Sequence, residues 1–185
     1  ALVPALAAAT YLFGWRALLL AAVAVAVSVA TEVLSQLVFR REVSVSDGSA
    51  AVTGLLLAFT CPPQTPVWMV ALGAFAAIFL VKQIFGGVGY NIFNPALAAR
   101  ALMLASFPVA MTLWAAPIRS LAFGGVDATA AASALGIVKE AAKAGTAAVM
   151  PYGYLDLLLG NIPGSLGETC KIALLLGAAF LFVRK

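Results

Sequence analysis

The residues best suited to binding a charged cofactor lie in a polar stretch, residues 124–143, that interrupts an otherwise apolar chain. Asp127 supplies a carboxylate, and Thr129 and Ser133 supply hydroxyls separated by alanines. Small neighbours let a bulky group approach the backbone, and a hydroxyl beside a helix start is a suitable seat for a phosphate. The stretch therefore indicates either a phosphate-binding segment or a solvated helix start capped by Asp127 or Thr129.

The composition of the whole chain is that of an integral membrane protein. Of its 185 residues, 64% are hydrophobic and 10% charged, with a mean hydropathy of +1.08. A soluble domain has roughly 25% charged residues. No polar–apolar alternation typical of barrel strands is present, so we predict an all-α membrane protein. Two cysteines and no histidine exclude a histidine metal site and a four-ligand cluster within this chain.

Four apolar stretches predict membrane helices. Residues 1–14 predict the first, residues 17–39 a full span of about 23 residues, residues 67–81 another span, and residues 169–183 the last one. The acidic residue Glu32 falls in the last third of the second stretch. A carboxylate at that place lies either near the lipid headgroups or at a functional site.

Charged and aromatic residues at the ends of these stretches predict the orientation. We expect Trp68 and Lys82 at opposite interfaces of the third stretch. Placing Arg40, Lys82 and Arg184 on the cytoplasmic side follows the excess of basic residues in cytoplasmic loops. Residues 108–168 are then extracytoplasmic.

Two further apolar runs are too short to cross a bilayer alone. Residues 50–60 end at a proline-rich turn, and residues 95–107 follow Asn94 and Pro95, which predict an N-cap and a first helical position. Short helices with a polar mouth are typical of broken or re-entrant segments. The N-terminal end of the second run, which also carries Arg100, would face a ligand or pack in a tight turn.

Four segments in a fixed order carry a resemblance to a known family: SDGSAAVTGLLLAFTCPPQTPVW, KQIFGGVGYNIFNPALAARALML, VDATAAASALG and GSLGETCKIALLLG. They resemble the D subunit of the Rnf ion-translocating ferredoxin:NAD oxidoreductase and, more distantly, the B subunit of the sodium-translocating NADH:quinone reductase. The resemblance covers nearly the whole chain. It implies a five-helix repeat over residues 1–107, a flavin-bearing extracytoplasmic segment over residues 108–168, and an incomplete second repeat that opens with residues 169–185.

The same resemblance implies a cofactor and the residues that hold it. FMN would be joined through its phosphate to Ser133, with Thr129 as the alternative and Asp127 at the family's aspartate. Alanines stand where the family has a hydroxyl, a glycine and a proline. The isoalloxazine ring requires an apolar cleft with a few donors, which we expect the two short helices to line.

Three residues outside that segment complete the implied site. Arg100 would stabilise negative charge on the ring or phosphate, or lie at the interface as a snorkelling arginine. Asn94 would cap the N-terminal end of the short helix over residues 95–107, which would face the ligand. Glu168 lies in a Gly-Glu-Thr turn like the family's, and would cap the last helix or carry a proton or cation.

The implied function is electron transfer within a redox-driven ion pump of the inner (cytoplasmic) membrane. Covalent FMN would carry electrons between flavoprotein and iron–sulfur partner subunits, coupled to movement of Na⁺ or H⁺, and this chain would not be catalytic alone. A second, non-covalent flavin is left open. The alternative is a urea-transporter-like channel or solute carrier without flavin, which the broken helices also suggest.

Overall fold

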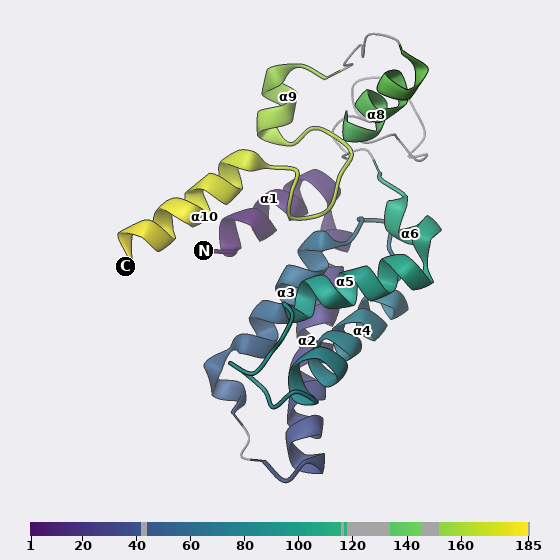
Figure 1. The fold of residues 1–185 in the computed structure, drawn as a ribbon. Helices are drawn as coiled ribbons and strands as arrows, with labels where there is room; N and C mark the ends of the chain where they lie inside the picture. The colour runs from purple at the N-terminus through teal and green to yellow at the C-terminus, as the bar shows by residue number, and fades with distance from the viewer. Residues whose placement is uncertain (42–43, 116, 118–133, 146–151, 185) are drawn as a thin grey trace. The chain divides into compact units, whose positions relative to one another are not determined.

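The computed structural model describes residues 1–41, 44–115, 117, 134–145 and 152–184, and each regular element among them is a helix (Figure 1). This confirms the predicted all-α class, while the five-helix repeat stays a prediction. The elements are α1 (Val3–Phe13), α2 (Trp15–Val38), the short 3₁₀ helix η1 (Val45–Asp47), α3 (Ser49–Thr60), α4 (Val67–Ala76), the π-helix η2 (Ala77–Gln83), α5 (Pro95–Ser106), α6 (Pro108–Thr112), α8 (Ala134–Ala144), α9 (Tyr154–Leu159) and α10 (Lys171–Val183).

Helix α2 is the longest element in the described part of the chain and the one that meets the length of a membrane span. It has 24 residues, and its most apolar window has a hydropathy of 2.3. At a rise of about 1.5 Å per residue this length can cross the hydrocarbon core. Helices α1, α3, α5 and α10 are apolar but shorter, and α4 with η2 forms a 17-residue stretch.

The chain divides into two compact units. The first unit comprises residues 1–18, 62–64 and 113–185, and the second comprises residues 19–61 and 65–112. Helix α2 begins in the first unit and continues into the second. The larger cavity described below belongs to the first unit, and a buried ion pair belongs to the second.

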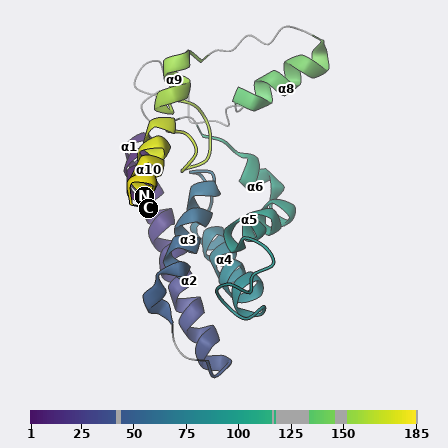
Figure 2. The ribbon, with the colours of Figure 1, turned by 60° about the vertical axis from the view of Figure 1, so that its left-hand side comes forward.

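In the first unit, α1 and α10 lie side by side (Figures 1 and 2). The buried residues Ala5, Ala9 and Leu12 recur every three or four positions on α1, which is the spacing of one helical face. On α10, Gly177 is buried, and a methyl group there would collide with the backbone carbonyl of Ala1. Small residues therefore allow close approach of the backbones.

In the second unit, α3, α4, α5 and η2 pack against one another. Gly54 of α3 faces α2 so closely that a Cβ there would lie 2.6 Å from the carbonyl oxygen of Ala24. Gly73 of α4 lies against Met103 of α5 in the same way. Glycines at helix crossings are common in membrane proteins because they let helices approach without a side chain between them.

Helix α5 begins as the sequence predicts. The Oδ1 atom of Asn94 accepts hydrogen bonds from the backbone N–H groups of Ala96 at 3.0 Å and Leu97 at 3.3 Å. Pro95 occupies the first helical position, where its missing N–H leaves no unpaired donor. The predicted N-cap is confirmed.

The end of α4 departs from the prediction. The sequence predicts one helix over residues 67–81 with Lys82 at the interface, but the helix widens into the π-helix η2, which includes Lys82 and Gln83. Both of these residues are buried. The ammonium group of Lys82 pairs with a carboxylate inside the second unit, and its place at a membrane interface stays a prediction.

Candidate functional site

The predicted attachment segment lies outside the described residues. Asp127, Thr129 and Ser133 fall within residues 118–133, and the next described element, α8, starts at Ala134. The phosphoester therefore stays a prediction, and the site must be approached from the residues that the structure describes.

Asn94 and Arg100, two of the predicted site residues, both belong to α5 in the second unit. The carbonyl oxygen of the Asn94 side chain is engaged in capping its own helix. Arg100 is half-buried, and its charge acts on the thiol of Cys61 at the end of α3. The two residues thus occupy the N-cap and the middle of one short helix.

Glu168, the third predicted residue that is described, lies in the first unit. Its carboxylate is exposed and accepts a hydrogen bond of 2.7 Å from the hydroxyl of Ser165. The N-cap position of α10 is Cys170, two residues further along, and its side chain makes no capping hydrogen bond. Glu168 therefore belongs to the turn before α10, together with Ser165.

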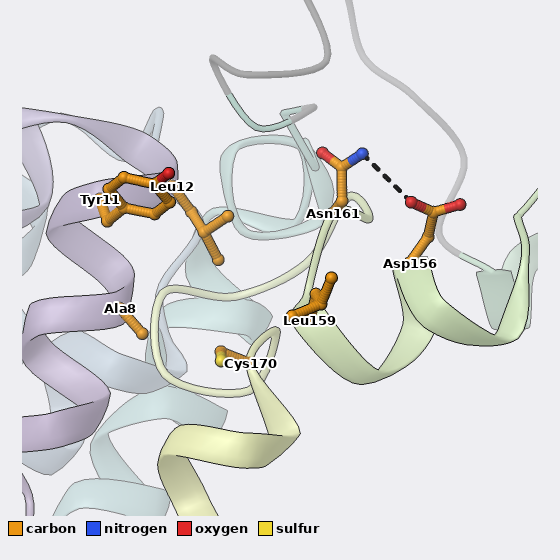
Figure 3. Close-up of a pocket in the computed structure, with 7 residues that line it drawn as sticks. All are labelled: Ala8, Tyr11, Leu12, Asp156, Leu159, Asn161 and Cys170. Atoms are coloured by element: carbon orange, nitrogen blue, oxygen red, sulfur yellow. Dashed lines mark hydrogen bonds between the residues drawn. The ribbon is translucent and has the colours of Figure 1, made fainter.

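The first unit contains a cavity of about 440 Å³ (Figure 3). Its volume lies in the range of small-molecule and cofactor sites, about 300–1,000 Å³. It is lined by residues of α1, of α9 and the turn that follows it, and of the start of α10, and they are Ala8, Tyr11, Leu12, Asp156, Leu159, Asn161 and Cys170. The walls are mainly apolar, with a small polar cluster at one end.

That polar cluster is fixed by local hydrogen bonds. The backbone N–H groups of Gly160 and Asn161 both donate to the carbonyl of Asp156 at 2.9 Å. Gly160 has φ 89°, and a Cβ there would lie 2.6 Å from the backbone of Thr169, so the turn requires glycine. The turn sets Asn161 beside the start of α10.

One atom in the cluster has an unused capacity for hydrogen bonding. The side-chain nitrogen of Asn161 donates to Oδ1 of Asp156 at 3.4 Å (Figure 3). Its Oδ1 atom is buried and has no partner among the described residues. Buried polar atoms are normally paired, so this acceptor calls for a partner that carries an N–H or O–H donor.

The charge of the cavity limits what it can hold. Asp156 is the only charged residue among the seven that line it, and a phosphate would be repelled by that carboxylate. A flat, neutral heterocycle with one N–H donor matches apolar walls and a free acceptor. The cavity therefore fits the isoalloxazine ring of a flavin better than its phosphate.

The sequence predicts a cleft lined by the short helices now seen as α3 and α5, and that cleft stays a prediction. The first-unit cavity is lined by residues of α1, of α9 and the turn after it, and of the start of α10. Its apolar lining residues are scattered over the chain, so neither their types nor their spacing identify them in the sequence. The turn residues Gly160 and Asn161 are the one local signal.

A buried ion pair joins Glu32, which the sequence marks as either interfacial or functional, to Lys82, a pairing that the sequence does not predict. In the second unit, the carboxylate of Glu32 is 1% exposed, and its Oε1 atom lies 2.5 Å from Nζ of Lys82. The burial of Glu32 favours a functional role over a place among lipid headgroups.

In the described residues these features are those of an α-helical protein with one apolar helix long enough to cross a membrane and several shorter apolar ones. The model of the NQR2, RnfD, RnfE family matches residues 1–185, and the chain belongs to this family. The resemblance inferred from four segments is thereby confirmed.

Individual relatives agree with this assignment. The D subunit of the Na(+)-translocating ferredoxin:NAD(+) oxidoreductase complex of Acetobacterium woodii is 44% identical over 187 residues, covering 100% of this chain and 55% of that protein. The D subunit of the proton-translocating ferredoxin:NAD(+) oxidoreductase complex of Clostridium ljungdahlii is 40% identical, covering 100% and 56%. The D subunit of the ion-translocating oxidoreductase complex of Rhodobacter capsulatus is 37% identical, covering 100% and 57%. The chain thus spans just over half the length of these relatives.

Proposed function

We propose that this chain is part of a membrane subunit of an ion-translocating ferredoxin:NAD oxidoreductase complex, where it serves electron transfer. The observation that carries the proposal is the family match over residues 1–185. Its partners would be the flavoprotein and iron–sulfur subunits of the complex. The protein would lie in the cytoplasmic membrane, with residues 108–168 on the outer side.

The proposed cofactor is FMN, held by an ester between its phosphate and the hydroxyl of Ser133, with Thr129 as the alternative acceptor. A bound flavin supplies reversible acceptance and release of electrons. The first-unit cavity supports this proposal, since its volume, apolar walls and free acceptor suit the ring. Asp127 keeps its proposed place beside the attachment residue, and Glu168 keeps its proposed role as a carrier of a proton or cation.

The cavity residues would bind, orient and shield the ring. Leu12 and Leu159 would exclude water from the ring, and Asn161 would offer its side-chain oxygen to the ring N–H. Asp156 holds Asn161 in place by accepting from its side-chain nitrogen. A donor–acceptor pair of this kind fixes orientation more than it adds affinity, because the exchange with water is nearly balanced.

Denaturing gel electrophoresis of the purified protein tests the attachment. We expect a band that fluoresces under ultraviolet light, and a mass increase of one FMN moiety on the peptide that contains Ser133. Ser133→Ala should abolish both signals, while Thr129→Ala should leave them. Thr112→Ala, which removes an exposed hydroxyl on α6, is the matched control.

Two results would count against the proposal. A dark band with an unmodified Ser133 peptide would remove the covalent flavin, and fluorescence lost only in Thr129→Ala would move the ester to that residue. Solute flux into liposomes carrying the flavin-free protein alone would support the alternative, a channel or solute carrier of urea-transporter type.

A further inference from the structure

The second unit holds a buried ion pair between α2 and η2. Glu32 is the only acidic residue of α2, and its Oε1 atom accepts from Nζ of Lys82 at 2.5 Å and from the side-chain nitrogen of Gln83 at 3.0 Å. Both donors come from η2. π-Helical turns are rare and often occur at functional sites. Ionisable groups inside membrane proteins are costly and usually functional.

The other oxygen of the same carboxylate is unused. Oε2 of Glu32 is buried and has no hydrogen-bond partner in the described part of the chain. Glu32 lines a cavity of about 230 Å³, which is large enough for several water molecules. An unpaired carboxylate oxygen in a region of low dielectric is expensive, so it requires a ligand that donates a hydrogen bond or brings positive charge.

The cavity extends from Glu32 to the surface of the second unit. Glu32, Gln36 and Gln83 form its buried part, while Arg41, Ser44 and Asp47 line it and are themselves exposed. Water can therefore approach the carboxylate from the end of the unit that carries η1. Polar side chains therefore line the cavity between the buried Glu32 and the surface of the second unit.

We propose that Glu32 is a proton-binding site, loaded through this cavity, in which Oε2 takes up the proton. The described residues contain no group of three or more acidic or cysteine side chains that could hold a metal ion. Lys82 already supplies a positive charge at Oε1, which repels a second cation nearby. A single proton matches a single unpaired oxygen.

Lys82 can stay hydrogen-bonded when Glu32 is neutral. Its Nζ atom also donates to the hydroxyl of Ser49 at 2.6 Å, and that hydroxyl donates to Oδ1 of Asp47 at 2.8 Å. Lys82 thus lies between a buried carboxylate and a surface carboxylate. When Glu32 is protonated, Lys82 would stay linked to the carboxylate of Asp47 through the hydroxyl of Ser49. Its buried charge would therefore not be left without a partner.

The other charged groups around the site are few. Arg41, which follows α2, donates to the backbone carbonyl of Gln83 at 3.2 Å and lines the cavity. Helix α3 contributes no charged residue, and on α5 the charge of Arg100 acts on Cys61. Asp47, Lys82 and Arg41 are therefore the groups whose charges govern proton uptake by Glu32.

Infrared difference spectroscopy of the intact membrane protein in lipid nanodiscs, recorded between high and low pH, tests this proposal. We expect a protonated-carboxyl C=O band that appears as the pH falls and shifts in D₂O. Glu32→Gln should abolish that band, while Glu140→Gln, an exposed glutamate on α8, should leave it. The test does not depend on the flavin, since no electron transfer is measured.

Two milder variants keep the proposal testable if Glu32→Gln does not fold. Lys82→Gln removes the neighbouring positive charge, so the band should appear at a pH higher by roughly one to three units. Ser49→Ala cuts the link to Asp47 and should move the band to lower pH. A band unchanged by all three substitutions, no band in the wild type, or a band suppressed by Na⁺ at fixed pH would overturn the proposal.

Discussion

The two cavities of this protein differ in what surrounds them. The first-unit cavity of about 440 Å³ has mainly apolar walls and one free amide oxygen. The second-unit cavity of about 230 Å³ is bordered by an ion pair and polar side chains. Apolar walls with one acceptor select a neutral planar group, whereas polar walls around a buried carboxylate admit water and protons. The two cavities thus suit different proposed ligands, a ring in the first unit and a proton in the second.

The two regions also differ in how the sequence builds them. The polar end of the first-unit cavity is formed by neighbouring residues of the turn after α9, where Gly160 and Asn161 are adjacent. The ion pair of the second unit joins Glu32 and Lys82, which are 50 residues apart. Substitutions in this one turn should therefore alter the first-unit cavity. Replacing either Glu32 or Lys82 should break the ion pair of the second unit.

The largest expected effect is the loss of a charge from the second unit. Lys82→Met leaves Glu32 buried without its counter-charge, which should lower stability by about 3–5 kcal/mol. Thermal unfolding in detergent measures this difference. The double variant with Glu32→Gln should recover most of the loss, and Lys143→Met on α8, where the lysine is exposed, should change little. A single variant as stable as the wild type would show that the pair is dispensable.

The next effect concerns the turn of the first unit. Gly160→Ala adds a methyl group that would lie 2.6 Å from the backbone of Thr169 at φ 89°. We expect destabilisation of about 2–4 kcal/mol from crowding and backbone strain together. Gly145→Ala has φ 66° and open space around the new methyl, so only about 1–2 kcal/mol should be lost. Equal losses in the two variants would mean that the contact with the start of α10 is unimportant.

A smaller effect should separate ring binding from covalent attachment. Leu159→Trp narrows the first-unit cavity and should loosen the proposed flavin ring, lowering its fluorescence anisotropy in the native protein. The fluorescent band after denaturation should remain. Leu158→Trp is the control, since Leu158 does not line the cavity and lies next to Leu159. Identical anisotropy in both variants would argue that the ring binds elsewhere.

The smallest effect is expected at the mouth of the second-unit cavity. Hydrogen bonds from the backbone N–H and then the hydroxyl of Ser49 hold the pKa of Asp47 below its usual 3.8. Because the folded pKa is the lower one, this stabilisation is present above pH 3.8 and is lost as pH falls through the folded pKa. Asp47→Asn should therefore lower stability at neutral pH by less than about 0.5 kcal/mol. Unfolding measured in acid should show no difference between variant and wild type.

The sequence predicts the local features of the fold well. The length of α2 follows from its apolar run, and the start of α5 follows from Asn94 and Pro95, since both depend on neighbouring residues. The pairing of Glu32 with Lys82 is not predictable in this way. It requires the mutual placement of α2 and η2, and the π-helical turn that buries Lys82 has no signal in the sequence.

The candidate site, too, is only partly predictable from the sequence. The hydroxyls of Thr129 and Ser133 stand out because they interrupt an apolar chain. The cavity in the first unit is made of Ala8, Leu12 and Leu159, residues that are ordinary in any membrane helix. Concave surfaces arise from the packing of distant segments, which residue types alone do not specify.

The isolation of Glu32 within α2 also bears on the biogenesis of the protein. The ribosome delivers Lys82 only 50 residues after Glu32, so α2 meets the translocon before its counter-ion exists. A lone carboxylate inside a membrane helix opposes insertion by a few kcal/mol, and the strongly apolar remainder of α2 must offset it. Lys82→Met should therefore leave the insertion of α2 unchanged while it impairs later helix assembly.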